Sequence, residues 1–208
     1  RAYQMAVASD PFNDGKFVVI FEDNSGSGHG HAVVGTVSGT TPSYGTEVEF
    51  ESGGTARELN IDFDPNTENK FVITYKDGSN YGCAIVGTIS DTSISFGSEY
   101  VFNNASTYEP SVAFDPNNSG KFVVVYKDSG NSQYGTACVG TVSGTAISYG
   151  SEYVFNSGVS DPVGNIAFDP NDSGKFVVVY RDRGNSSYGT AVVGTVSGTA
   201  ISYGTAVV

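Results

Sequence analysis

Three loops of this chain carry the same set of groups: a basic residue followed at once by an aspartate, then an asparagine and a tyrosine. The three sets are Lys76, Asp77, Asn80 and Tyr81; Lys127, Asp128, Asn131 and Tyr134; and Arg181, Asp182, Asn185 and Tyr188. Such groups bind sugars, because polar side chains bond the hydroxyls while an aromatic ring packs on the C–H face. The same residue types also form hairpin turns for backbone reasons alone, and that interpretation stays open. The loops therefore predict repeated contacts with a glycan or another surface polymer, which several weak sites hold tightly through effective concentration.

A second pattern places oxygen-bearing side chains at alternate positions before a glycine. It occurs twice, as Asp115, Asn117 and Ser119 and as Asp169, Asn171 and Ser173. Calcium-binding loops present hard ligands to a hard cation in this way, so calcium is a possible ligand of these turns. The alternative is an aspartate-capped turn in which proline fixes φ and glycine takes the left-handed conformation. The turn is the favoured interpretation, and no other cofactor is expected.

The remaining chemistry is sparse. His29 and His31 share a face of one strand and would ligate a transition metal if Glu22 or Asp23 approached, although sequence drift explains them equally well. There is no GxSxG elbow, P-loop or HExxH motif. Most acidic residues recur from repeat to repeat, as Glu47, Glu99 and Glu152 do, whereas catalytic pairs are singular. We therefore expect no enzyme activity.

These groups lie on four near-copies of one segment. Asp-Pro pairs begin at Asp10, Asp64, Asp115 and Asp169, about 52 residues apart, a spacing typical of stacked or ring-forming repeats. We number the copies units 1 to 4, over residues 1–54, 55–105, 106–159 and 160–208 of a single repeat domain.

Each unit contains four strand-like segments separated by turn-forming residues. In unit 3 they are residues 111–115, 121–128, 134–143 and 147–156. Four short antiparallel strands per unit indicate an all-β fold and a propeller blade. The sequence thus predicts a β-propeller of four four-stranded repeats closed into a ring, with half of a larger ring or a fragment of a longer array as alternatives.

The composition agrees with this class and excludes others. A net charge of −12 repels phosphate backbones and anionic headgroups, so neither nucleic acid nor a membrane surface is an expected partner. No apolar run approaches the length of about 20 residues that spans a bilayer, so membrane insertion is not expected. Cys83 and Cys138 stand at non-equivalent places in neighbouring units, which favours free thiols over a disulfide.

The run YGTAVVGTVSGTAISYG, from Tyr188 to Gly204, resembles repeats of large predicted proteins of marine bacteria and their phages, including tail-fibre-like proteins. The resemblance covers essentially the whole chain. It implies an extracellular or virion-surface repeat protein with a role in adhesion, and supplies no catalytic residues. The principal hypothesis is thus a non-catalytic, lectin-like binding module. The alternative is an assembly subunit of a fibre or virion appendage that self-associates.

If the repeated loops bind glycans, the double variant Asp128→Ala with Asp182→Ala should lose the binding that the unaltered chain shows on a glycan array in calcium. Retained affinity in that variant would exclude these loops.

Overall fold

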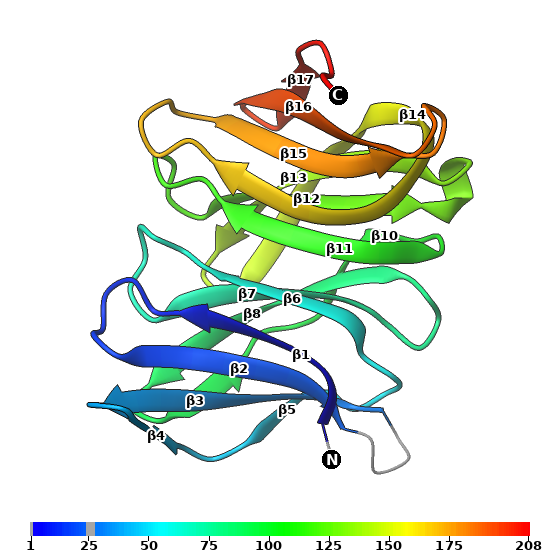
Figure 1. The fold of residues 1–208 in the computed structure, drawn as a ribbon. Coiled ribbons are helices and arrows are strands. Elements are labelled where there is room, and N and C mark those ends of the chain that lie inside the picture. The colour runs from blue at the N-terminus through cyan, green and yellow to red at the C-terminus, as the bar shows by residue number, and fades with distance from the viewer. Residues whose placement is uncertain (1, 24–27) are drawn as a thin grey trace.

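The computed structural model describes residues 2–23 and 28–208, apart from the side chains at positions 162–164. Unit 1 forms an antiparallel sheet in the order β1-β2-β3-β4, and β5 also pairs with β3. These strands are β1 (Ala2–Ser9), β2 (Lys16–Asp23), β3 (Gly30–Ser38), β4 (Thr41–Tyr44) and β5 (Val48–Glu51). The fourth strand of the unit is therefore broken into two short pieces on the same edge (Figure 1).

Unit 2 repeats this topology, with β9 and β10 both paired to β8. Its strands are β6 (Arg57–Phe63), β7 (Lys70–Lys76), β8 (Gly82–Ser90), β9 (Ser93–Phe96) and β10 (Tyr100–Asn103). Units 3 and 4 differ in one respect, because β14 is long enough to close unit 3 and then open unit 4, and it joins both into one sheet. Their strands are β11 (Thr107–Phe114), β12 (Lys121–Asp128), β13 (Tyr134–Ser143), β14 (Ala146–Phe168), β15 (Lys175–Asp182), β16 (Tyr188–Ser197) and β17 (Ala200–Tyr203), with a 3-10 turn over Ser129–Asn131.

The predicted all-β class is confirmed, and in unit 3 the bounds of β12 and β13 coincide with those expected from the sequence. The first strand, β11, begins four residues earlier than predicted. Its pairing with β12 shifts register between Tyr108 and Ser111, and Glu109 there has a φ of 52°. An extra residue of this kind breaks the alternation of side chains, which hides the start of the strand from pattern analysis.

The apolar core is divided among the junctions between units. Val123 and Val125 of β12 point to one face of their sheet and pack with Phe176 and Val178 of unit 4. Val124 points to the other face and packs with residues of unit 2. Successive side chains of a strand face opposite sides, so the continuous apolar run of β12 places apolar side chains on both covered faces of its sheet.

A phenylalanine lies over a glycine of the neighbouring strand in every unit. In unit 3, Phe122 is the register partner of Gly140, and a Cβ built on that glycine would stand 2.1 Å from the ring. Equivalent pairs are Phe17 and Gly35, Phe71 and Gly87, and Phe176 and Gly194. The ring thus fills the space that a side chain would take, which is why glycine stands within the third strand of each unit.

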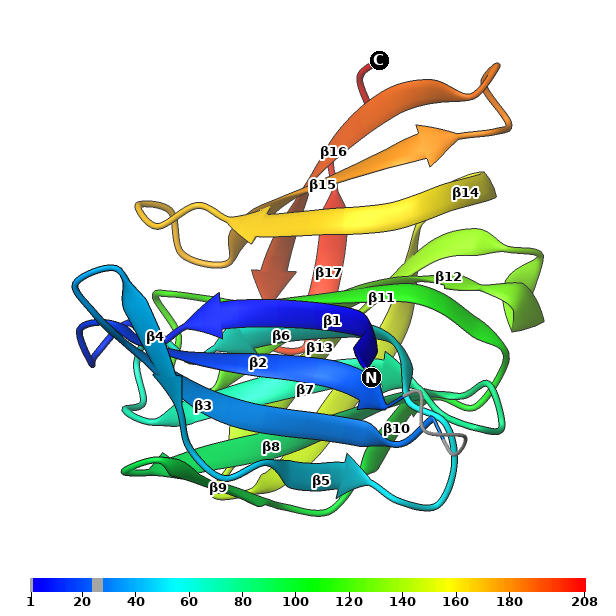
Figure 2. The ribbon, with the colours of Figure 1, turned by 60° about the horizontal axis from the view of Figure 1, so that its bottom comes forward.

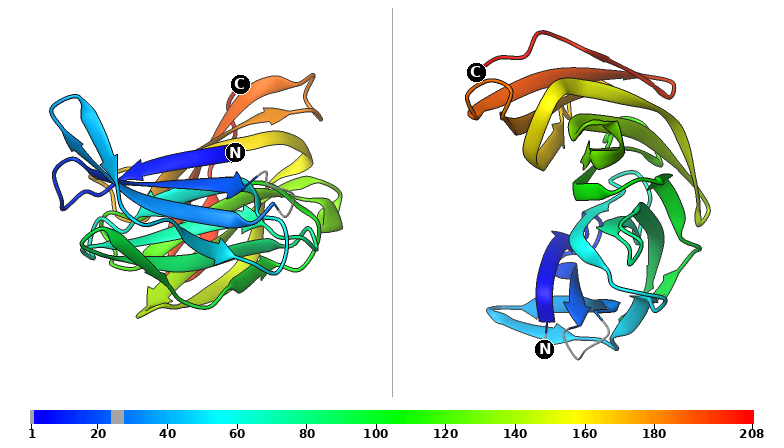
Figure 3. Two further views of the ribbon diagram at one scale, coloured as in Figure 1. Left: turned by 90° about the horizontal axis from the view of Figure 1, so that it is seen from below. Right: turned by 90° about the vertical axis from the view of Figure 1, so that its right-hand side faces the viewer.

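The first strands of successive units lie side by side: β1 contacts β6, β6 contacts β11, and β11 contacts β14 (Figure 2). The units follow an open arc, with both termini toward its open side (Figure 3, right). A ring closed within one chain, the predicted arrangement, is therefore not confirmed. Closure depends on the rotation from each unit to the next summing to a full turn, and these four units leave the arc open.

Cys83 and Cys138 are buried free thiols, as predicted. None of the described segments is a helix with the length and hydropathy of a membrane span.

The half-buried carboxylate of Asp62 connects two units. Asp62 on β6 accepts hydrogen bonds from the backbone N–H of Phe114 (2.8 Å), in unit 3, and of Phe63 (3.0 Å). Burial is the main cause that raises the pKa of Asp62 from 3.8 to about 6, and the neighbouring Asp64 adds to it. The folded chain therefore binds a proton here more tightly than the unfolded chain does. The contribution of this group to the free energy of unfolding is present below pH 4 and is lost as the pH rises through about 6.

Asp62→Asn removes this titration and keeps an oxygen that accepts from Phe114. Relative to the unaltered chain, the variant should gain up to about 3 kcal/mol in free energy of unfolding between pH 4 and pH 7, measured by urea denaturation. Asp91→Asn, at an exposed site, is the control and should show no such gain. A difference between Asp62→Asn and the unaltered chain that stays constant with pH would contradict the assignment.

Candidate functional site

The aspartates of the predicted sugar-binding loops cap the turns in which they stand. Asp77 accepts from the N–H groups of Ser79 (2.9 Å) and Tyr81 (2.7 Å). Asp128 and Asp182 each accept from the N–H two residues onward, at 2.8 and 2.9 Å. These carboxylates have a structural use in the turn, so their removal would also disturb the loop.

The basic residues of the same loops are paired within the chain. Lys76 is buried, pairs with Glu58 and lies 4.3 Å from the ring centroid of Tyr108. Lys127 pairs with Asp161 at 2.7 Å, and Arg181 lies 3.8 Å from the same carboxylate. Each of these cations lies on the second strand of its unit and pairs with a carboxylate on a first strand. That first strand belongs to the same unit for Lys76 and Arg181 and to the next unit for Lys127.

The amides and rings of these loops are more accessible. Asn80 has a φ of 70°, and its N–H donates to the carbonyl of Asp77. Asn131 and Asn185 are exposed, and Tyr134 is half-buried. Tyr81 and Tyr188 are 40% and 55% exposed. The asparagines of all three loops and the tyrosines of two of them are therefore open to a ligand.

The predicted calcium turns are satisfied from within the chain. Asp115 is fully buried and accepts from the backbone of Asn117 (2.9 Å) and the amide of Asn118 (2.8 Å). Asp169 accepts from the N–H of Asn171 (2.9 Å). The remaining predicted ligands bridge adjacent units: Asn117 donates to Asp169 O (3.5 Å), Ser119 Oγ lies 3.3 Å from Thr67 Oγ1, and Ser173 accepts from Asn118 (2.9 Å). Each has an intramolecular role, and calcium binding stays a prediction.

The two histidines pair with glutamates, and the recurrent glutamates of units 2 and 3 accept hydrogen bonds from tyrosines. His29 pairs with Glu49, and His31 pairs with Glu47 at 2.8 Å. At the position of Glu47 in unit 2, Glu99 accepts from Tyr75 Oη at 2.5 Å. Glu152 in unit 3 accepts from Tyr126 Oη at 2.7 Å.

An asparagine seals two of the junctions between units. Asn103 Nδ2, at the end of β10, donates to Asp128 Oδ1 of unit 3 (3.2 Å) and to Thr107 Oγ1 (3.1 Å). Asn156 repeats this contact with Asp182 (3.2 Å) and Ser160 (3.1 Å) one unit later. An amide can do this because it donates to the carboxylate with one end and accepts from the backbone with the other.

The junction between units 1 and 2 lacks this amide. The residue at the end of β5 is Glu51, which accepts from the N–H of Gly53 (2.6 Å) but has no proton to donate to Asp77 when ionised. The junction is a cleft of about 770 Å³, open to solvent. It is lined by Phe50, Glu51, Ser52, Gly53, Gly54, Thr55, Asp77, Gly78, Ser79 and Glu99.

Three carboxylates converge on this cleft. Burial is the largest cause that raises the pKa of Glu51, and the charge of Glu99 raises it further. Glu99 also accepts from the buried Tyr75 hydroxyl, which holds its carboxylate in place. A cation would relieve the repulsion among these groups, so the cleft is built to attract positive charge.

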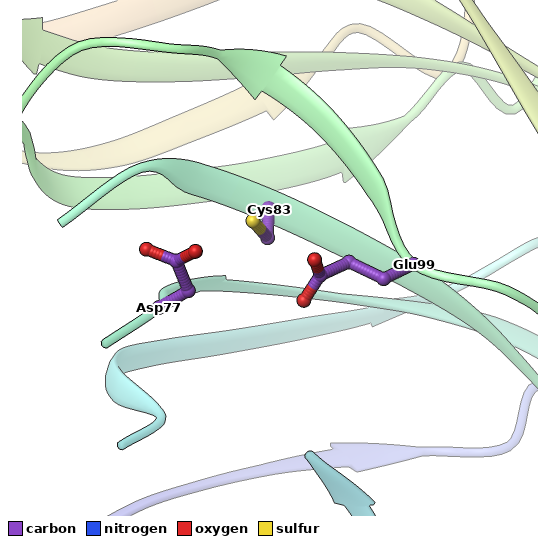
Figure 4. A group of neighbouring side chains, drawn as sticks. All are labelled: Asp77, Cys83 and Glu99. Carbon is purple, nitrogen blue, oxygen red and sulfur yellow. The ribbon is translucent and has the colours of Figure 1, made fainter. Parts of the chain in front are cut away.

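Two of these carboxylates lie close to a buried thiol, that of Cys83. Potential ligand atoms of Asp77, Cys83 and Glu99 lie within 4.8 Å of one another, and the three side chains point toward one another (Figure 4). Burial raises the pKa of Cys83 well above its usual range, so the thiolate that a metal ion requires is disfavoured. Three ligands, one of them a protonated thiol, fall short of the four typical of a structural zinc site.

The sequence reasoning missed this cleft. The signal was present in the aligned repeats, where Phe50-Glu51 stands against Phe102-Asn103 and Phe155-Asn156. The predicted sugar and calcium ligands stand at recurring positions, whereas this cleft lies where the recurrence fails.

No protein-family model and no curated protein matches the chain. Solved structures of similar fold include Sqt1 from Chaetomium thermophilum, with a TM-score of 0.61 at 14% identity over 92% of this chain and 43% of that one. A structure of the same protein bound to the N-terminus of the ribosomal protein L10 gives 0.59 at 13% identity, over 92% and 45%. Sqt1 from Saccharomyces cerevisiae gives 0.54 at 9% identity, over 95% and 58%.

At these identities the likeness concerns the fold, and it supports a repeat fold of the propeller type. The chain spans less than two thirds of the length of each of these proteins.

Glu51→Asn should close the cleft by restoring the amide that the other two junctions contain. We expect the free energy of unfolding at pH 7 to rise by about 1–2 kcal/mol, through one added hydrogen bond to a carboxylate and the loss of like-charge repulsion. Chemical denaturation measures the change. Glu51→Gln, whose longer side chain does not copy Asn103, is the matched control and should gain less. Equal stability of both variants would contradict the sealing role of the amide.

Proposed function

We propose that this chain is a non-catalytic binding module that holds a cationic segment of a protein partner in the acidic cleft between units 1 and 2. The carrying observation is the replacement of the sealing asparagine by Glu51, which leaves three carboxylates facing a cavity at one junction. The volume of about 770 Å³ is that of a typical ligand pocket.

Two further observations support a peptide as the ligand. The net charge of −12 gives the whole surface an attraction for basic segments, which raises their rate of encounter. In addition, one similar structure, that of Sqt1 from Chaetomium thermophilum, has the N-terminus of the ribosomal protein L10 bound.

A fluorescently labelled hexalysine peptide tests this proposal, with a hexaglutamate peptide as the charge control. We expect hexalysine to bind and Glu51→Asn or Glu99→Gln to weaken it about tenfold, equivalent to roughly 1.4 kcal/mol, in a polarisation assay. Binding should also weaken as the pH falls, because the raised pKa of Glu51 makes this group lose its negative charge at a higher pH than an ordinary glutamate does.

The matched control is Glu152→Gln, which removes one charge at the equivalent position of unit 3, away from the cleft. It should leave hexalysine affinity unchanged within a factor of two. If it weakens binding as much as Glu99→Gln does, the peptide responds to net charge and the cleft is not the site.

A glycan is the second candidate ligand, favoured by the exposed rings of Tyr81 and Tyr188 at equivalent loop positions. Because the loop aspartates cap their turns, the sharper variant for the glycan array described above is Tyr81→Ala with Tyr188→Ala. An extracellular or virion-surface location belongs to this second proposal and derives from the sequence resemblance.

A further inference from the structure

The two ends of the arc expose apolar sheet faces. The first end face, on unit 1, contains Met5, Val7, Val37 and Tyr44, each more than 40% exposed. The last end face, on unit 4, contains Val177, Val179, Val193 and Val207. Val7 and Val179 are 62% and 44% exposed. Side chains of this kind, gathered on one face, usually mark an interface.

Within the chain, the equivalent positions are buried between units. The counterparts of Val177, Val179 and Val193 in unit 3 are Val123, Val125 and Val139, which have no exposed surface and pack against unit 4. The counterparts of Val7 are Ile61 and Val112, buried against units 1 and 2 respectively. The first end face is therefore the kind of surface that the last end face packs against elsewhere in this molecule.

The groups that make one polar contact of the internal junctions also occur at the two ends of the arc. Lys121 of unit 3 donates from Nζ to the carbonyl of Gly198 in unit 4 at 2.6 Å. Lys175 stands at the position of Lys121 in unit 4, where its side chain is 43% exposed and pairs with Asp172. Gly39 stands at the position of Gly198 in unit 1 and is exposed. A lysine donor and its carbonyl acceptor are thus present on opposite ends of the arc.

A close contact between glycine and threonine marks the outer edge of each internal junction. A Cβ on Gly97 or Gly150 would lie 2.5 Å from the carbonyl oxygen of Thr145 or Thr199 in the next unit. Gly204 is the equivalent residue of unit 4, and its nearest neighbour is Val193 O, in the same unit, at 3.8 Å. The threonine that would meet it is Thr40, which is exposed on unit 1.

We propose that a second copy of this chain covers these faces, with the last end face of each copy packed on the first end face of the other. Head-to-tail contacts of this kind close into a ring when the rotation permits. Propellers have typically four to eight blades. Two copies of the four units described here make a ring of eight, which lies within that range.

Sedimentation and light scattering at high micromolar concentration test the proposal directly. The expected particle has twice the chain mass of 21.7 kDa and a ring outline in negative-stain images. Val7→Asp and Val179→Asp should each give monomers that keep the circular dichroism spectrum of the unaltered chain, because both side chains are already exposed. Val154→Asp, at an exposed valine outside the end faces, is the control and should still dimerise.

Mixing the two monomeric variants reports the orientation of the contact. A Val7→Asp copy keeps an intact last end face and a Val179→Asp copy keeps an intact first end face, so the mixture should recover dimers through one junction. Gly204→Ala should weaken dimerisation without lowering monomer stability, whereas Gly150→Ala, at the internal equivalent, should destabilise the fold itself. A monomer at all concentrations, open polymers, or a mixture that fails to recover dimers would overturn the proposal.

Discussion

The structure depends on one constraint, which is that the second strand of each unit is apolar on both faces. A sheet built on such a strand is most stable when both of its faces are covered, so each unit favours a neighbour before it and another after it. The three junctions inside the chain provide this cover with aromatic and branched side chains and with hydrogen bonds between consecutive Asp-Pro turns. Local strand propensity favours the strands of each unit, but the burial of apolar side chains between units stabilises the fold as a whole.

The sequence was sufficient for features that repeat locally. The apolar run of residues 121–128 and the alternating segment of residues 134–143 identify their strands, and turn-forming residues bound them. The register shift near Glu109 could not be predicted, because a residue other than glycine in the left-handed conformation has no compositional signal. Ring closure could not be predicted for a different reason. The rotation between units depends on how whole faces pack, and small differences accumulate along the arc.

The candidate cleft shows a limit of reasoning from recurrence. The repeated Lys or Arg and Asp residues of the loops proved to hold turns and strands together, so their recurrence follows from the recurrent fold. Glu51 is informative because it departs from the asparagine of the other junctions while Thr55 and Asp77 keep their places. In a repeat protein, a position that breaks the repeat is a candidate for function, because the recurrent fold does not account for it.

The exchange of asparagine for glutamate also shows how little separates a sealed junction from an open one. Asn103 and Asn156 each donate to a carboxylate of the next unit through a single amide group. Glu51 occupies the equivalent position at the cleft. The other two junctions are therefore latent clefts of the same design. A repeat array of this kind can gain or lose an acidic cleft by one substitution, leaving the strands and cores unchanged, and duplication of a unit would copy whichever version it carries.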